Sequence, residues 1–309
     1  MRIGYVALAA GLATLVAGCG GSGVSMQSGA AAAGAASGSD RSAVHAVPTV
    51  TEVSQLGRIR AVLKYPQPRD GRDVYQARLL IFRSGRLLLD ERLLPPWPNY
   101  GATPSDVWWF RRYRRRSLVV RDLDRDGEPE VLVNLHGGGA HEIPYTYIYS
   151  YERGTPFSRP MYDGIQHVWD DPGVRLTDLN RDRTPEFIGG DSRFEYRFVG
   201  HYVPIQIWEY RRKRLLDVTR RFQAAIRRDL ARYRACLPNH ARRGRDERSC
   251  LAAWAADEAL LGQVRLIWPV LEAARVKGNL GPGYAPFSPY GRAYIAAVRS
   301  FLHRTGYLA

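Results

Sequence analysis

The chain contains 309 residues, and 45 lysines and arginines outnumber 30 aspartates and glutamates, which gives a net charge of +15. Lysine occurs only at Lys64, Lys213 and Lys277. An arginine bias of this kind is typical of a GC-rich genome, so the charge alone names no partner. After residue 19 no segment is both apolar and long enough to cross a bilayer, which excludes further transmembrane helices.

The N-terminus has the pattern of a bacterial lipoprotein signal. Met1 and Arg2 precede a short apolar run over residues 3–16, which suits a signal peptide better than a membrane span. Small residues come directly before Cys19, as in a lipobox. We therefore expect a signal peptide over residues 1–19, with Cys19 lipid-modified, and a flexible Gly/Ala/Ser tether over residues 20–48. The alternative is an ordinary secretory signal in which Cys19 is incidental.

The pattern over residues 49–218 indicates strands and turns. Ser84 and Gly85 separate two apolar runs, which is the signal of a hairpin. Two of the expected strands are rich in aromatic residues, and each of these comes after an acidic loop. Strands are predicted over residues 58–63, 76–82, 86–89, 117–120, 130–135, 145–151, 186–188, 204–210 and 215–218.

The two acidic loops share one spacing. Residues 122–130 and 178–186 each place oxygen-bearing side chains at loop positions 1, 3, 5 and 9, with proline at position 8. Ca²⁺ takes about six to eight oxygen ligands, and alternate side chains of a loop that folds back converge on one point. The candidate ligands are Asp122, Asp124, Asp126, Glu130 and the carbonyl of Glu128 in the first loop, and Asp178, Asn180, Asp182, Glu186 and the carbonyl of Thr184 in the second.

The two copies are not equivalent. Gly127 suits a left-handed turn at position 6, whereas the second loop has Arg183 there, and Asn180 removes one negative charge. We therefore expect a weaker second site. The alternative for either loop is a turn rich in Asp and Asn with no metal. An EF-hand is excluded because position 12 is Val133 or Gly189 instead of a bidentate glutamate.

A strand, an Asp-x-Asp-x-Asp-Gly-x-Pro-Glu loop and another strand resemble the FG-GAP or VCBS-type repeats of integrin-like β-propellers. In that family the side chains at positions 1, 3, 5 and 9 bind Ca²⁺ at a strand connection. The resemblance is clearest over residues 115–218. Because about 170 residues hold only three or four blades of four strands, a seven-bladed ring is excluded. We expect an open, propeller-blade-like antiparallel β domain over residues 49–218.

From residue 219 the apolar spacing becomes helical, which predicts a small α-helical domain over residues 219–309 and an α+β fold for the whole chain. Thr219 is the expected N-cap of the first helix. A second helix is expected from Ser249 to Gly262, and Pro269 is expected to begin or kink a third. Ser288 is the expected N-cap of the last helix.

Cys236 and Cys250 form an even pair, which predicts a disulfide in an oxidising compartment. A closed loop of about 15 residues is worth about 3 kcal/mol in the entropic model. Two buried free thiols are the alternative.

Signals for enzyme activity are few. The segment from His136 to Glu142 offers two imidazoles and a carboxylate that suit a transition metal. His167, Asp170 and Asp171, with Asp191 and Glu195, offer carboxylates for glycoside hydrolysis. The sequence contains no Gly-x-Ser-x-Gly elbow, phosphate loop or zincin motif. We therefore expect no enzyme activity.

The sequence predicts a lipid-anchored, extracytoplasmic calcium-binding protein with a binding or scaffold role in the cell envelope. The basic and aromatic residues 108–116 suit an anionic wall polymer or lipid headgroups, and another surface protein is an alternative partner. Nucleic acid is not expected outside the cell. The alternative function is an extracytoplasmic hydrolase that acts on wall polymer or exopolysaccharide.

Overall fold

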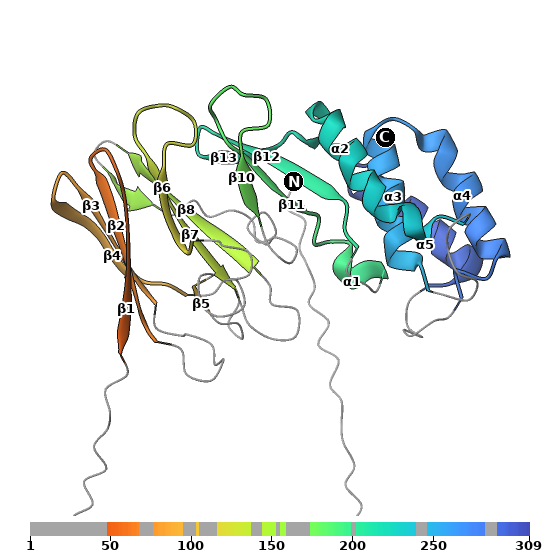
Figure 1. Ribbon diagram of the computed structural model, residues 1–309, viewed down its shortest axis with the longest axis horizontal. Coiled ribbons are helices and arrows are strands. Elements are labelled where there is room, and N and C mark those ends of the chain that lie inside the picture. Colours follow the sequence, from red (N-terminus) through yellow and green to blue (C-terminus); the bar gives the residue numbers. More distant parts are fainter. Residues whose placement is uncertain are drawn as a thin grey trace, which may run out of the picture. The chain divides into compact units, whose positions relative to one another are not determined.

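The structure is a computed structural model, which describes residues 48–67, 77–94, 103–104, 116–136, 144–152, 155–158, 174–198, 202–238, 246–281 and 289–309. Residues 46–309 form one compact unit. Antiparallel sheets come first along the chain and helices follow, which confirms the α+β class (Figure 1). None of the helices in the described ranges is long and apolar enough to cross a membrane.

Three antiparallel sheets succeed one another along the chain. Sheet 1 has the order β1 (Thr49–Leu56), β2 (Ile59–Pro66), β3 (Arg78–Arg83) and β4 (Arg86–Arg92). Sheet 2 contains β5 (Thr103–Pro104), β6 (Leu118–Arg121), β7 (Glu130–His136), β8 (Pro144–Glu152) and β9 (Thr155–Ser158), and β7 pairs with β5, β6 and β8. Sheet 3 has the order β10 (Arg175–Thr177), β11 (Glu186–Gly190), β12 (Ile205–Arg211) and β13 (Arg214–Asp217). Over the described strands none of these sheets closes, so the expected open antiparallel assembly is confirmed, and its relation to propeller blades stays a prediction.

Sheet 2 is buried on both faces. Side chains alternate between the two faces of a strand. Along β7, Val131 and Val133 therefore join a core with sheet 1, while Leu132 joins a core with sheet 3. Strand β8 divides in the same way, with Tyr147 on the first face and Ile148 on the second. The apolar runs that the sequence showed in these strands follow from this double burial.

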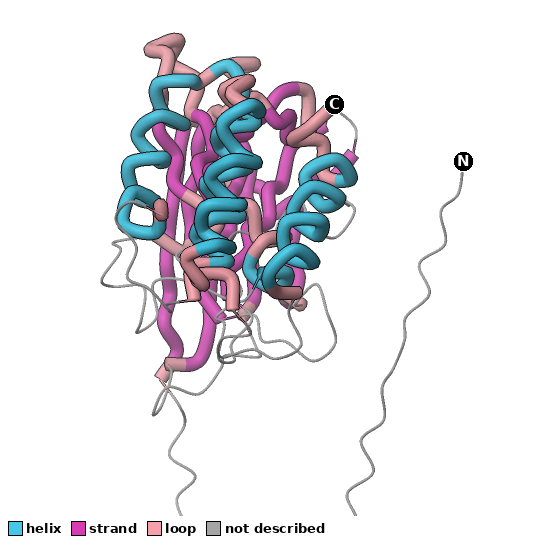
Figure 2. Tube along the Cα trace, turned by 90° about the vertical axis from the view of Figure 1, so that its right-hand side faces the viewer, coloured by secondary structure: helices cyan, strands magenta, loops and turns pink. Residues whose placement is uncertain are grey.

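Sheet 3 packs against helices on its other face. Ile207 of β12 lies in a core with Val218 and Ala225. Figure 2 shows the helices in a layer in front of the strands. The helical elements are α1 (Glu195–Phe198), η2 (Thr219–Arg221), α2 (Gln223–Leu230), η3 (Ala231–Cys236), α3 (Arg248–Leu260), α4 (Val264–Val276) and α5 (Gly291–Arg304).

Several expected helix starts are wrong. Thr219 caps no helix, because its Oγ1 accepts from Ile207 N and donates to Asp217 Oδ1, so it fastens the chain to β12. Pro269 does not begin a helix but lies inside α4. The last helix has Tyr290 at its N-cap, so the expected cap position is wrong, and Ser288 itself lies outside the described residues. Hydrogen bonds to a neighbouring strand outcompeted the local capping signal at Thr219.

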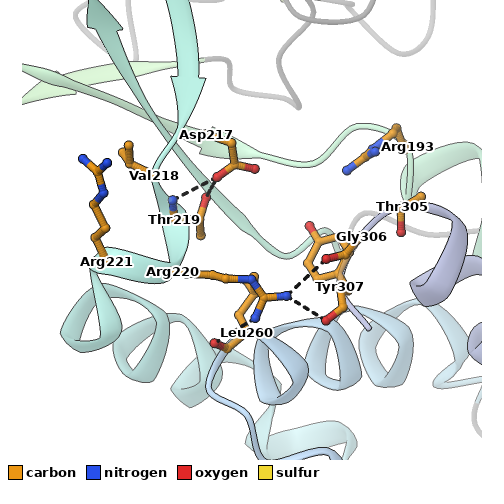
Figure 3. Close-up of a pocket in the computed structure, with 10 residues that line it drawn as sticks. All are labelled: Arg193, Asp217, Val218, Thr219, Arg220, Arg221, Leu260, Thr305, Gly306 and Tyr307. Atoms are coloured by element: carbon orange, nitrogen blue, oxygen red, sulfur yellow. Dashed lines mark hydrogen bonds between the residues drawn. The ribbon is translucent and has the colours of Figure 1, made fainter. Parts of the chain in front are cut away.

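One arginine joins the end of β13 to the helices. The Arg220 guanidinium donates to four carbonyl oxygens. It lines a cavity of about 240 Å³, and Figure 3 shows its bonds to Gly306 and Tyr307. Two of the four carbonyls belong to Ala259 and Leu260 at the end of α3, and two belong to Gly306 and Tyr307 after α5. Helix carboxyl ends carry orphan carbonyls and a partial negative charge, which a guanidinium satisfies.

The other two arginines that line the cavity pair with carboxylates instead of carbonyls. Arg193 Nη2 lies 2.6 Å from Asp191 Oδ2, and Arg221 Nη1 lies 3.1 Å from Glu209 Oε2. The described arginines of this cavity therefore serve the packing of the helices against sheet 3.

Candidate functional site

The two acidic loops occupy equivalent places in their sheets. The first loop, residues 122–130, connects β6 to β7, where Arg121 pairs with Glu130 across the strands. The second loop, residues 178–186, connects β10 to β11, where Thr177 pairs with Glu186. Each loop thus leaves and re-enters its sheet through neighbouring antiparallel strands, as the repeated sequence predicts.

Both loops are held by the same three hydrogen bonds. The position 9 glutamate accepts from the position 2 amide, with Leu123 N to Glu130 Oε2 at 2.9 Å and Leu179 N to Glu186 Oε2 at 2.7 Å. The other two shared bonds run from the position 6 amide to the position 1 carboxylate and from the position 7 amide to Oδ1 of the position 5 aspartate. One backbone frame therefore serves both sequences.

This frame requires left-handed backbone at positions 4 and 6. The φ angles are 62° at Arg125 and 87° at Gly127 in the first loop, and 64° at Arg181 and 73° at Arg183 in the second. Only Gly127 accommodates this conformation without strain. The expected positive φ at Arg183 is confirmed, because the second loop keeps this backbone conformation although it has no glycine at position 6.

The loops differ in which oxygens already have a donor. In the second loop, Asp182 N donates to Asp178 Oδ1 at 3.1 Å and to Asn180 Oδ1 at 3.0 Å. Asn180 Nδ2 donates in turn to Asp182 Oδ2 at 2.9 Å. In the first loop, Asp122 Oδ1 and Asp124 Oδ1 are buried and have no hydrogen-bond partner. The first loop therefore has two oxygens in need of a positive partner, whereas the second satisfies its own.

Three carboxylates of the first loop converge. One oxygen each from Asp122, Asp124 and Glu130 lies within 4.8 Å of the others. Glu130 is 3% exposed. Its burial raises its pKa to about 8, and the charges of Asp124, Asp126 and Asp122 add to the rise against the opposing Leu123 amide. Burial also raises the pKa of Asp124. Clustered negative charge is thus costly here unless a cation compensates it.

The second loop has a different electrostatic balance. Hydrogen bonds from Thr184 lower the pKa of Asp182. Burial raises the pKa of Glu186, which is 2% exposed. An exposed aspartate that is already stabilised in its charged form needs no cation, so this loop is the poorer candidate.

Long-range contacts surround the first loop. Arg83, at the end of β3, forms a two-pronged pair with Glu128, with Nη2 to Oε1 at 2.5 Å and Nε to Oε2 at 3.2 Å. Arg212 N, in the β12–β13 turn, donates to Asp124 Oδ2 at 3.3 Å. Arg125 Nη1 donates to the carbonyl of Asp182 at 3.2 Å. The sequence signals did not predict these partners, because they lie in other sheets.

The donor set of the first loop fits a hard cation. All converging atoms are carboxylate oxygens, which suit Ca²⁺, and no described imidazole or thiolate approaches them. The pairing of the Glu128 side chain with Arg83 leaves only its carbonyl for the role that the spacing assigns to it. The exposed Asp126 does not belong to the converging group, and its part in cation binding stays a prediction.

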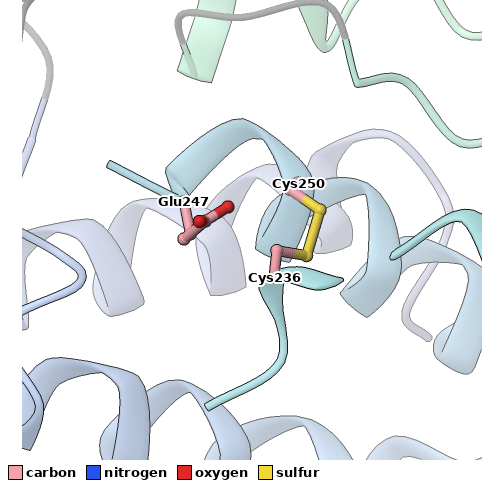
Figure 4. A group of neighbouring side chains, drawn as sticks. All are labelled: Cys236, Glu247 and Cys250. Carbon is pink, nitrogen blue, oxygen red and sulfur yellow. A yellow bond between two sulfur atoms is a disulfide. The ribbon is translucent and has the colours of Figure 1, made fainter. Parts of the chain in front are cut away.

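A second convergent group is structural. Cys236, Glu247 and Cys250 lie close together, and the two cysteines form a disulfide with Cα atoms 6.2 Å apart (Figure 4). The predicted disulfide is confirmed. Metals bind thiolates, and an oxidised pair offers none.

Most other predicted site residues lie outside the described residues. These include Cys19, the basic segment up to residue 115, and His141, Glu142, His167, Asp170 and Asp171. Asp191 is described, and its carboxylate is taken up by Arg193 and by the Tyr307 hydroxyl at 3.0 Å. Asp191 therefore stabilises the packing of the C-terminal segment against the residues after β11.

Comparison with curated proteins shows similarity over about half of the chain. The chain is 29% identical over 164 residues to a probable thylakoid lumen protein of Synechocystis, a match that spans 50% of this chain and 46% of that protein. No family model matches the chain. A Xanthomonas type IV secretion system related protein aligns over 57% of this chain and 95% of its own, with 12% identity and a TM-score of 0.25. A TM-score of this size is too low to support a statement about fold or function.

Proposed function

We propose that this chain is an extracytoplasmic calcium-binding protein whose first acidic loop holds a structural Ca²⁺. The observation that carries the proposal is the pair of buried, unpartnered oxygens on Asp122 and Asp124, next to the buried Glu130. Each buried polar atom without a partner costs about 1–3 kcal/mol, more when it is charged. Bound Ca²⁺ would supply the missing positive charge.

The loop's role is that of a brace between strands. Asp122 and Asp124 follow β6, and Glu130 is the first residue of β7. Side chains from both ends of the connection therefore hold one cation. Three antiparallel sheets, with acidic loops at equivalent connections of two of them, support an FG-GAP or VCBS-type origin for this part of the chain.

The location and partner belong to the same proposal. The curated relative is named for a lumen, which is an extracytoplasmic compartment. The Cys236–Cys250 disulfide is typical of oxidising compartments. With Cys19 as the lipid anchor, the protein would serve as a binding or scaffold component of the envelope, for an anionic polymer or another surface protein.

Calorimetric titration with Ca²⁺ tests the proposal. We expect the tighter site, in the first loop, to be lost in Asp124→Asn and retained in the matched second-loop variant Asp182→Asn. Any binding by the second loop should be weaker. Unfolding of the wild-type protein should shift by about 2.7 kcal/mol at a Ca²⁺ concentration 100-fold above Kd. The proposal is wrong if Ca²⁺ and chelator leave the unfolding midpoint of the wild-type protein unchanged.

A further inference from the structure

Three segments that are distant in the sequence meet at one edge of the sheets. These are the first acidic loop, the second acidic loop and the β12–β13 turn, and we call them together the turn edge. The Arg125 guanidinium joins the first loop to the second, and the Arg212 amide joins the β12–β13 turn to Asp124. In Figure 1 the β6–β7 and β10–β11 connections lie at the same end of their sheets.

The turn edge concentrates the backbone outliers. Six non-glycine residues of the described chain have left-handed φ angles, and five of them are basic residues of this edge. Glycine or asparagine suits such positions, and two-residue hairpin turns favour Asn-Gly. A side chain there costs on the order of 1 kcal/mol. The five residues are Arg125, Arg181, Arg183, Arg212 and Lys213. Arginine and lysine occupy backbone positions that disfavour any side chain. We infer that their positive charge has a function that offsets this cost.

Acidic groups point inward at this edge and basic groups point outward. The two loops and residues 211–214 carry eight carboxylates and seven cationic side chains. Of these charged groups, six arginines but only two aspartates, Asp126 and Asp182, are exposed. The carboxylates of these two aspartates accept hydrogen bonds from backbone amides of their own loops. Counted as formal charges, eight negative against seven positive groups give −1, and one Ca²⁺ in the first loop would change this to +1.

We propose that the turn edge binds an anionic polymer, and that Ca²⁺ in the first loop is required for this binding. This inference rests on the proposed function. Guanidinium groups pair with phosphate, sulfate and carboxylate groups in two-pronged geometry, and several of them in a row match a repeating anion. Asp124 links the two events, because the carboxylate that would bind the cation also orders the Arg212 amide.

The described chain enters the folded unit at the end of sheet 1 opposite the turn edge. The β1–β2 turn lies at the same end of sheet 1 as Ser84, whose amide donates to the Arg58 carbonyl at 2.8 Å, and the Arg83–Glu128 pair connects that end to the first loop. Strand β1 begins at Thr49, eight residues away at the opposite end of sheet 1, about 25 Å from this edge. The described chain therefore enters sheet 1 away from the turn edge, which leaves the turn edge clear of the start of β1.

Binding of the purified protein to immobilised dextran sulfate tests this inference, with neutral dextran as the blank. The variant Arg181→Gly/Arg183→Gly/Arg212→Gly removes three charges at positions where glycine fits the backbone. The control Arg227→Ala/Arg228→Ala/Arg234→Ala removes three exposed charges from the helical region. We expect the edge variant to lose about tenfold or more in affinity, chelator to cause a similar loss, and the control to stay within about twofold.

Equal losses in the two variants would overturn the turn edge as the site, and binding that resists chelator would overturn its dependence on calcium. Anionic phosphatidylglycerol vesicles form a separate arm. If they bind through the same three arginines while dextran sulfate does not, the partner is a lipid surface and the polymer is refuted. Calcium calorimetry on the edge variant separates the two proposals. Retained Ca²⁺ binding with unaltered polymer binding refutes only the turn edge, whereas absent Ca²⁺ binding in the wild-type protein refutes the proposed function.

Discussion

Replacing Arg220 with alanine should loosen the attachment of the helices to sheet 3. The guanidinium donates to Tyr307 O at 2.8 Å, Gly306 O at 3.1 Å, Ala259 O at 3.3 Å and Leu260 O at 3.4 Å. The bonds to Tyr307 and Ala259 are partly buried, and the other two are exposed. Because water replaces exposed hydrogen bonds at little cost, the lost stability comes mainly from the two partly buried bonds.

Hydrogen bonds from charged donors contribute about 1.5 kcal/mol or more each, and the favourable interaction with a helix end adds a few tenths. Discounted for partial exposure, the loss in the free energy of unfolding is about 2 kcal/mol. For a folded unit of this size that corresponds to about 4–8 °C in Tm. Urea denaturation followed by circular dichroism measures it.

The neighbouring Arg221→Ala is the matched control. Within the described residues Arg221 pairs only with Glu209, and its side chain is 65% exposed, so we expect a loss of at most about 1 kcal/mol. Arg220→Lys keeps the charge but cannot reach both pairs of carbonyls, so its stability should lie between those of wild type and Arg220→Ala. If Arg220→Ala lowers the unfolding free energy by an amount within about 0.5 kcal/mol of the loss in Arg221→Ala, the four Arg220 hydrogen bonds do not hold the helices to sheet 3.

Three further predictions concern stability. Burial, with Asp229 nearby, raises the pKa of Asp257 well above its usual value, so the folded state holds a proton that the unfolded state releases. The resulting contribution to the free energy of unfolding is complete at acid pH, below about 3.9, and is lost as pH rises through the folded pKa. Asp257→Asn should flatten that part of the pH profile of urea unfolding. An unchanged profile would contradict the assignment to Asp257. Reduction of the Cys236–Cys250 bond, which spans 14 positions, should lower the unfolding free energy by about 3 kcal/mol. The control is the Cys236→Ser/Cys250→Ser variant, whose stability should not respond to the reductant. Arg183→Gly should raise the unfolding free energy by about 0.5–1 kcal/mol because φ is 73° there, and a decrease would show that the arginine stabilises the loop.

Local patterns in the sequence predicted the framework of the site well. The hairpin around Ser84 and Gly85, the strands on both sides of the acidic loops and the left-handed position at Gly127 all follow from alternation and turn chemistry. The helical apolar spacing that the sequence shows after residue 219 is confirmed in the last helix, which buries Tyr294 and Val298. These features depend on residues within a few positions of one another, where steric and hydrogen-bonding preferences act directly.

The helix starts were harder to predict, because capping signals compete with tertiary partners. Thr219 has the right chemistry for an N-cap, yet its hydroxyl bonds to β12. Strand β1 was also missed, since residues 49–56 alternate with half-exposed side chains and lack a strong apolar run. Burial against a neighbouring strand, β2, forms it.

The sequence by itself determined that two acidic loops share one spacing and that the second lacks the glycine and one carboxylate of the first, because side-chain type and glycine placement are local features. Only the tertiary structure decided which oxygens remain without a donor. It also decided that the Arg212 amide, 88 positions away, faces Asp124. A periodic pattern states which face of a strand is apolar but not which sheet will cover it. The partners of a charged loop are therefore set when the sheets stack, and the charge of the turn edge is a property of the folded molecule.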